Sequence, residues 1–276
     1  MGLFAHYGMD VVFSPIEWSL VMGSLIRSAT LSVFAVFTLA ACGGGGGGGG
    51  AAGTPPPVTV NADPGGIWYG FAHNTTLGES IEVVGVSISN GELRFIDDQG
   101  VQYHGSLQVS GNSYTASFRA IAPLGEYFLN GSSVLTGSMT GTISERNALE
   151  GSYIMSSGER GTVSLLYDNL YQRPSDLSRL AGTWIDAYSE VISVDSMGRI
   201  FAQDSGGCVY NGTAAVVDAR YNAYRINLTV SNCGNFNGAY SGLGVLDDWQ
   251  ANGDNRLLII QLSNQVWSLT ASFGKL

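Results

Sequence analysis

The chain of 276 residues contains few charged side chains, and basic residues are especially scarce. Lys and Arg together number 12 against 22 Asp and Glu, the formal net charge is −10, and Lys275 is the single lysine. Proteins that bind nucleic acid or anionic membrane surfaces present clusters of basic side chains. The composition therefore excludes nucleic acid as a partner and argues against docking to a membrane through basic residues.

The sequence also lacks the motifs of common enzyme classes. It has three histidines and no H-E-x-x-H, no G-x-S-x-G and no phosphate-binding loop. Glu79 and Glu82, with Glu190 further on, could serve as acid–base carboxylates, but such residues are routine at exposed strand ends. His104 is expected at a solvated strand position. We therefore predict a non-enzymatic protein without catalytic residues or a cofactor.

One turn gathers oxygen-bearing side chains. Residues 247–255 read DDWQANGDN, and calcium prefers oxygen ligands in such loops. The register lacks the EF-hand pattern and its final bidentate Glu. A plain hairpin turn is the preferred interpretation, and no metal site is predicted.

No apolar run is long enough to span a bilayer as a helix. Residues 31–41 form an apolar run of eleven residues, whereas a spanning helix needs about 20. With Arg27 upstream, this run suits the hydrophobic region of a secretory signal peptide. A buried helix that ends at a loop cysteine is the alternative, but the polyglycine that follows offers such a helix nothing to pack on. The segment Leu39–Cys42 resembles the bacterial lipobox, which implies cleavage before Cys42 and acylation of that cysteine.

The segments around the lipobox suggest a simple organisation. An acidic start (Asp10, Glu17) is unusual for a signal peptide, so residues 1–21 are interpreted as a spurious extension and 22–41 as the signal peptide. Residues 42–63, with Gly43–Gly50 and a triple proline, are expected to form a flexible, lipid-anchored tether. Because Gly43 is not Asp, the resemblance implies an outer-membrane lipoprotein of a Gram-negative bacterium. Its orientation, periplasmic or at the cell surface, stays open.

The remainder of the chain contains an internal repeat. Residues Gly91–Gly105 align with Gly198–Gly212 without a gap, at a constant offset of 107, which continues to Tyr114 and Tyr221. The matched pairs include Gly91 and Gly198, Tyr103 and Tyr210, and, upstream, Trp68 and Trp184. Downstream, Gly151–Tyr153 matches Gly238–Tyr240. We predict two related domains, 64–170 and 182–276, joined by residues 171–181 with Ser175 as the cap of a short helical turn.

Each copy shows the period of β-structure. In Tyr114–Ala120 and Tyr224–Val230, apolar residues alternate with polar ones, and turn sequences recur at hairpin spacing. The predicted fold class is all-β, with two tandem small antiparallel meander barrels of about eight strands each. Transmembrane barrels also alternate, but their strands need about 9–11 residues and most strands here are shorter. We therefore expect soluble barrels.

Both copies open with a G-x-W triplet, Gly66–Trp68 and Gly182–Trp184. This opening resembles the first strand of lipocalins and other calycins, in which the tryptophan plugs the closed end of the barrel. The resemblance implies that a small-ligand carrier is a possible function. Because each copy has only about 100 residues, we expect side chains to fill both barrels.

Two cysteines remain once Cys42 is assigned to the anchor. Cys208 and Cys233 lie almost opposite each other if the hairpin between them turns near Arg220 and Tyr221. We predict a disulfide between them, since a redox or metal pair would lack a C-x-x-C motif and nearby histidines. In the first copy, Val101 occupies the position of Cys208, so that barrel is expected to lack the bond.

These observations favour one function over three others. The leading prediction is an outer-membrane-anchored, non-enzymatic lipoprotein, held by its acyl chains, that binds an unknown protein or glycan or supports the envelope. The alternatives are a surface lipoprotein that captures host proteins, a periplasmic lysozyme inhibitor, and a calycin-type carrier of a small ligand.

Overall fold

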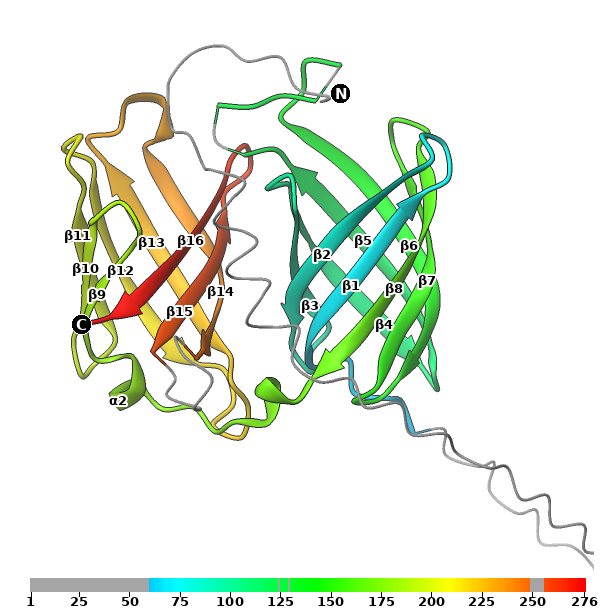
Figure 1. The fold of residues 1–276 in the computed structure, drawn as a ribbon, viewed down its shortest axis with the longest axis horizontal. Coiled ribbons are helices and arrows are strands. Elements are labelled where there is room, and N and C mark those ends of the chain that lie inside the picture. Colours follow the sequence, from blue (N-terminus) through cyan, green and yellow to red (C-terminus); the bar gives the residue numbers. More distant parts are fainter. Residues whose placement is uncertain (1–59, 124, 129, 249–255) are drawn as a thin grey trace, which may run out of the picture.

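The computed structural model describes residues 60–123, 125–128, 130–248 and 256–276. In this part of the chain, the strands form two closed antiparallel barrels in which consecutive strands are paired (Figure 1). The predicted fold class, two eight-stranded meander barrels, is therefore confirmed. Cys42 and the rest of residues 1–59 lie outside the described residues, so the extension, signal peptide and tether stay predictions.

The first barrel is closed by a long pairing of its first and last strands. Its strands are β1 (Gly66–Asn74), β2 (Glu79–Ser87), β3 (Glu92–Asp97), β4 (Gln102–Ser110), β5 (Ser113–Ile121), β6 (Val134–Ser144), β7 (Ala148–Met155) and β8 (Arg160–Asp168). β1 and β8 pair from Ile67–Asp168 to Asn74–Gly161. Along β8, Val163 and Leu165 are buried while Thr162 and Ser164 are exposed, so the period of two places apolar side chains inside.

The second barrel is closed by a much shorter pairing. Its strands are β9 (Gly182–Ile185), β10 (Val191–Val194), β11 (Arg199–Gln203), β12 (Val209–Val216), β13 (Tyr224–Ser231), β14 (Gly238–Asp247), β15 (Leu257–Ser263) and β16 (Ser268–Lys275). β16 meets β9 only at Gly274–Ile185 and Lys275–Trp184. Two strands of four residues, β9 and β10, make one wall of this barrel short.

Two short helices connect the barrels. They are η1 (Asn169–Gln172) and α2 (Leu177–Leu180). The predicted cap, Ser175, is wrong: the Asp176 side chain accepts the hydrogen bond from the Arg179 amide at 3.2 Å. Ser175 is buried instead and donates to the Asp218 carbonyl at 3.2 Å. Among the described residues, no helix is long and apolar enough to cross a membrane.

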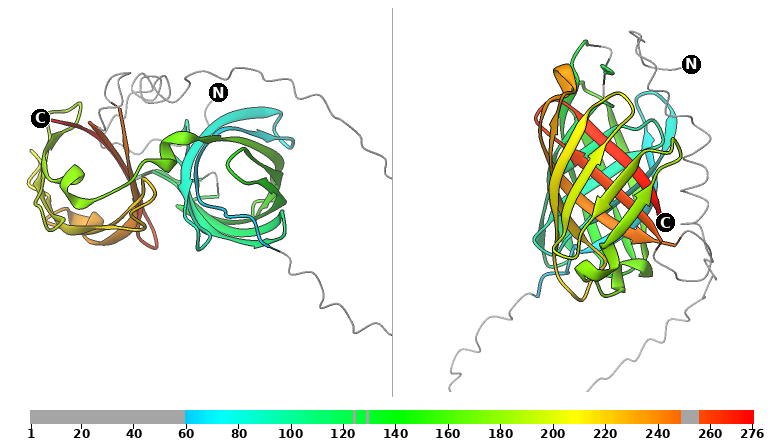
Figure 2. Two further views of the ribbon diagram at one scale, coloured as in Figure 1. Left: turned by 90° about the horizontal axis from the view of Figure 1, so that it is seen from below. Right: turned by 90° about the vertical axis from the view of Figure 1, so that its left-hand side faces the viewer.

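The barrels stand side by side and share a packed interface (Figure 2). Its apolar part joins Ile67 and Ile96 of the first barrel to Leu243 of the second. Its polar part includes a pair between Glu92 and Arg225, whose Nη1 donates at 2.7 Å. Because apolar and charged groups both cross the interface, each barrel limits the orientation of the other.

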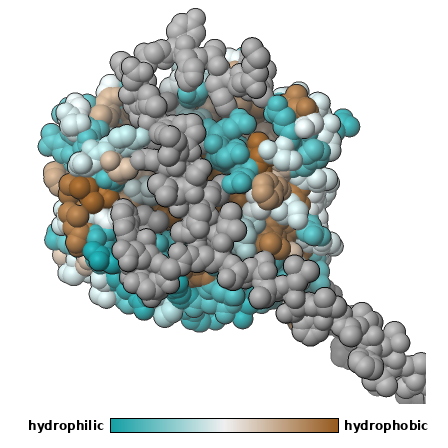
Figure 3. All heavy atoms as spheres, in the orientation of Figure 1, coloured by the Kyte–Doolittle hydropathy of each residue, from teal (hydrophilic) through white to brown (hydrophobic). Residues whose placement is uncertain are grey.

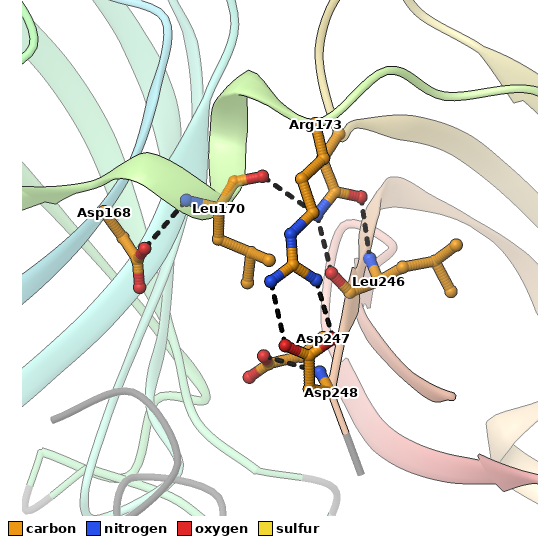
Figure 4. A network of polar contacts seen from close by, with 7 residues as sticks. Asp168, Leu170, Arg173, Leu246, Asp247 and Asp248 are labelled. Carbon is orange, nitrogen blue, oxygen red and sulfur yellow. Dashed lines mark hydrogen bonds and ion pairs between the residues drawn. The ribbon is translucent and has the colours of Figure 1, made fainter. Parts of the chain in front are cut away.

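A partly buried junction fixes the connecting segment to the second barrel (Figure 4). The Arg173 guanidinium donates two hydrogen bonds to the Asp248 carboxylate, at 2.7 and 2.8 Å. The Asn222 side chain donates to the Leu246 carbonyl at 2.6 Å and accepts from the Leu246 amide at 3.0 Å. The Asp248 carboxylate, which belongs to the predicted oxygen-rich turn, therefore holds the junction together. Residues 249–255 of that turn lie outside the described residues.

Candidate functional site

The first barrel encloses a cavity of about 440 Å³ that opens at one end. The loops that follow β1, β3, β5 and β7 contribute Leu77, Gln99, Phe128 and Ser157 to its lining, so these loops surround the mouth. The expectation that side chains fill both barrels is wrong for this one. Small inward residues explain the space, because Ala72 and Ala120 face the interior where longer side chains would meet.

The walls of the cavity are mainly apolar. Described residues that line them are Ile81, Val83, Leu93, Phe95, Phe118, Leu135, Met139, Met155 and Val163. Phe118 and Tyr103 meet edge to face, with ring centroids 5.8 Å apart. Such walls suit an apolar ligand, since burying apolar surface is favourable by about 25 cal/mol per Å².

Polar groups gather at the mouth. Asn74 is buried, and its amide nitrogen donates to Glu159 Oε2 at 3.1 Å. Its carbonyl oxygen accepts from the amides of Thr76 and Leu77, at 3.0 and 3.1 Å, which holds the β1–β2 turn. Glu79, the next strand's first residue, also lines the cavity. The mouth is thus a rim of oxygen atoms on rigid strand ends.

The repeat identified in the sequence forms the same turn in both barrels. Asp97 Oδ1 accepts from the Val101 amide at 2.9 Å and Oδ2 accepts from the Tyr103 hydroxyl at 2.8 Å. In the second barrel, Asp204 accepts from the Cys208 amide and the Tyr210 hydroxyl, both at 2.9 Å. The predicted repeat residues Tyr103 and Tyr210 therefore have a structural role in closing this turn.

Burial changes the acidity of the turn that lines the cavity. It raises the pKa of Asp97 to about 7, because the desolvation of the carboxylate outweighs its hydrogen bonds to Tyr103, Val101 and Gln99. Burial, reinforced by the Asp97 charge, also raises the pKa of Tyr103 well above its usual value.

In each barrel, the tryptophan of the G-x-W triplet lies at the end opposite the Asp–Tyr turn described above. Trp68 and Trp184 are fully buried. Trp68 Nε1 donates to Ser87 Oγ at 2.8 Å, and Trp184 Nε1 donates to the Leu180 carbonyl at 2.8 Å. Trp68 belongs to the buried cluster at this end of the first barrel, away from the mouth of the cavity. Gly91 and Gly198, at φ of 90° and 78°, form turns at these same ends.

In the described part of the second barrel, a large cluster of buried side chains packs the interior. Because Val109 pairs with Tyr114 and Val216 pairs with Tyr224, the structural equivalent of Tyr114 is Tyr224 and not the predicted Tyr221. In this register, Val230 occupies the place of Ala120, and Tyr240 that of Gly137. Both larger residues are buried in the core.

The predicted disulfide between Cys208 and Cys233 is present, with Cα atoms 4.9 Å apart. It ties the β11–β12 turn to the segment before η2 (Gly234–Phe236). An Asp204 oxygen lies within 4.8 Å of both sulfurs, but sulfurs bonded to each other are not thiolate ligands. The bond joins neighbouring chain segments at the end of the second barrel that corresponds to the mouth of the first.

Other predicted positions have different outcomes. His104 was expected at a solvated position, which is wrong: it is buried at the interface, where Gln102 and Ser263 contact its ring nitrogens. Glu79 lines the cavity, whereas Glu82, three residues along the same strand, does not line it. Glu190 accepts from the Ser205 amide and hydroxyl, at 3.0 and 2.6 Å, and so fastens two loops together.

The sequence reasoning missed the lining residues Ala120, Phe128, Asn130 and Glu159. Phe128 and Asn130 belong to the loop between β5 and β6, and their signal was the greater length of the first copy there. Ala120 on β5 and Glu159 between β7 and β8 lie outside the longer segments and had no such signal. No family model matches the chain, and neither curated proteins nor solved structures gave a match. Fold and site define a tandem β-barrel protein in which the first barrel is hollow.

Proposed function

We propose that this protein is a lipid-anchored, non-enzymatic binding protein of the bacterial envelope whose first barrel holds a small apolar ligand. The observation that carries the proposal is the cavity of about 440 Å³, which adjoins the buried cluster that contains Trp68. Ligand sites are typically apolar cavities of about 300–1,000 Å³ with a few placed polar groups. The lipobox at Cys42 supports an outer-membrane location, on the periplasmic or the outer face.

Binding of a neutral fluorescent apolar probe, N-phenyl-1-naphthylamine, tests this proposal. The purified protein should enhance its fluorescence saturably. Ala120→Phe, which places a ring in the cavity, should abolish the effect, while Ala215→Phe on an exposed strand face should leave it unchanged. Near-ultraviolet circular dichroism verifies that both variants fold. Equal probe binding by both variants, or no binding by the parent protein, would contradict the proposal.

The anchor has a separate test. Cells grown with a radiolabelled or clickable palmitate should transfer the label to the protein. Cys42→Ala should remove the label, whereas Cys208→Ala should retain it. Label on the Cys42 variant would refute the lipobox interpretation. Protease treatment of intact cells then distinguishes the two faces, because only a surface-exposed protein is cleaved.

A second candidate function rests on an exposed apolar face of the second barrel. Phe201 on β11 is 54% exposed, and Val191 on β10 is 39% exposed. Ser193 pairs with Phe201 and lies two residues from Val191, so the two side chains share one outer face. Figure 3 shows a hydrophobic patch at the left-hand edge of the molecule, the side on which Figure 1 places β10 and β11. Exposed apolar patches often mark protein interfaces. Two assays of the parent protein and of the Phe201→Ser variant test the alternatives. Inhibition of lysozyme tests the inhibitor function, and binding of serum proteins tests the capture of host proteins. If the substitution changes neither activity, this face serves neither function.

A further inference from the structure

The charged groups of the cavity all have the same sign. Among the described residues that line it, the side chains that carry or can acquire a full charge are the carboxyl groups of Glu79, Asp97 and Glu159. The described lining includes no Lys, Arg or His. An apolar cavity with an acidic rim repels carboxylates and phosphates and attracts cations.

The acidic groups occupy two depths. Glu79 and Glu159 stand at the mouth, at the starts of β2 and β8, and Glu159 is held by Asn74 at 3.1 Å. Asp97 lies deeper, with only 3% of its surface exposed, at the end of β3. A ligand that enters between the loops therefore passes the rim before it reaches the apolar walls.

Two tyrosine hydroxyls of the cavity wall lie within range of the acidic groups. Tyr103 and Tyr153 both line it, and burial is the main cause that raises the pKa of each hydroxyl. The charge of Glu159 raises both further, and Asp97 adds to the effect at Tyr103. These hydroxyls thus add no positive charge to the wall of the cavity.

We infer that the hollow barrel accommodates an amphiphile with a positively charged polar end, of the alkylammonium type. This inference rests on the proposed function. The tail lies against apolar residues such as Leu135 and Met139, and the ammonium group sits at the mouth beside Glu79 and Glu159. Fatty acids and phosphate-bearing lipids of the same chain length bind more weakly, because their head groups meet like charge.

Competition against bound N-phenyl-1-naphthylamine tests the inference with three probes of equal chain length. They are dodecylamine, dodecanol and dodecanoate, each below its micelle concentration at pH 7. Dodecylamine should displace the dye at a concentration about tenfold lower than dodecanoate, with dodecanol between them. High salt should reduce this ratio, since screening weakens exposed charges.

Charge variants locate the effect. The double variant Glu79→Gln, Glu159→Gln should reduce the tenfold ratio to about twofold, while the dye still binds. Glu150→Gln, which removes one charge from an exposed strand position outside the lining, is the control and should leave the ratio unchanged. Equal displacement by all three probes, or preference for dodecanoate, overturns the inference and leaves the binding function standing. Failure of the dye to bind at all refutes the proposed function itself.

Discussion

The two barrels share a strand order and a turn, yet the first is hollow and the second is packed. Both begin with a buried tryptophan, and both close a turn with an Asp–Tyr hydrogen bond. They differ at interior positions, where Ala120 and Gly137 of the first correspond to Val230 and Tyr240 of the second. The repeated motif therefore specifies the frame, and the volume of a few inward side chains specifies whether a cavity exists.

Exchanging interior volumes should produce the largest effect. Tyr240→Ala in the packed barrel should lower the free energy of unfolding by about 3–5 kcal/mol, because it leaves a cavity and removes the hydrogen bond to the Phe236 carbonyl. Ala120→Val in the hollow barrel should change it by less than about 1 kcal/mol, because space is already present. Urea unfolding measures both. Similar losses in the two variants would contradict the hollow–packed distinction.

Removing the disulfide should have the next largest effect, and only on the second barrel. The bond closes a loop with a sequence separation of 25, so Cys208→Ala with Cys233→Ala should cost about 3 kcal/mol. Hydrogen exchange should locate the loss in β11–β14. The variant without the disulfide should still bind the dye in the first barrel. If dye binding is lost in this variant, the first barrel depends on the disulfide of the second.

Two buried side chains, Asp97 and His104, should make the free energy of unfolding depend on pH in opposite directions. Asp97, with its pKa raised from 3.8 to about 7, contributes stability that is full below pH 3.8 and is lost as the pH rises to 7. His104 has its pKa lowered from 6.5 to about 2 by burial and by the charges of Arg94 and Arg119. Its contribution is full above pH 6.5 and is lost as the pH falls toward 2. Each changes by about 1.4 kcal/mol per pH unit, so they oppose each other between pH 4 and 6.5.

Single substitutions should separate these opposing effects. His104→Asn, which introduces the residue found at the equivalent Asn211, should leave a stability that falls as the pH rises from 4 to 7. Asp97→Asn should leave one that rises from pH 4 to 6.5. Denaturation midpoints across this range provide the measurement. If both variants retain the profile of the parent protein, neither group carries the effect.

The smallest expected difference is between the equivalent turn glycines. A Cβ atom at Gly91 would lie 2.1 Å from the Leu107 carbonyl oxygen, and one at Gly198 would lie 2.3 Å from that of Ala214. Both residues also have positive φ. Gly91→Ala and Gly198→Ala should each cost about 1–3 kcal/mol and agree within about 0.5 kcal/mol. Clearly unequal costs in urea unfolding would show that the shared frame is not energetically equivalent.

Strand alternation predicted the barrels well, because the period of two depends only on local sequence. The disulfide followed from hairpin geometry: the observed pairs, from Val209–Ser231 to Val216–Tyr224, centre the turn on Arg220, half a residue from the prediction. The predicted match between Gly151–Tyr153 and Gly238–Tyr240 is wrong, because Gly151 lies on the seventh strand of its barrel and Gly238 on the sixth. Short glycine motifs recur on many strands and do not establish equivalence.

The cavity of the first barrel and the interface between the two barrels could not be predicted from the sequence. Alternation places Tyr103 inward and its neighbour His104 on the outer face, but nothing local indicates that the second barrel covers that face. The cavity depends on the sum of inward volumes around eight strands, which becomes visible only when their register is known. Both features arise from contacts between segments far apart in the chain.

The way in which the chain enters the first barrel gives its opening a direction. Ala62 donates to the Gly111 carbonyl at 2.9 Å, and Asn61 accepts from the Gly111 amide at 2.9 Å, so the chain joins beside Trp68 at the end opposite the mouth (Figure 1). With Cys42 acylated as proposed, the tether joins the barrel at its base, and the mouth lies at the end away from this attachment point. An anchor at this end leaves the mouth accessible to a ligand that arrives from the aqueous side or from a facing surface.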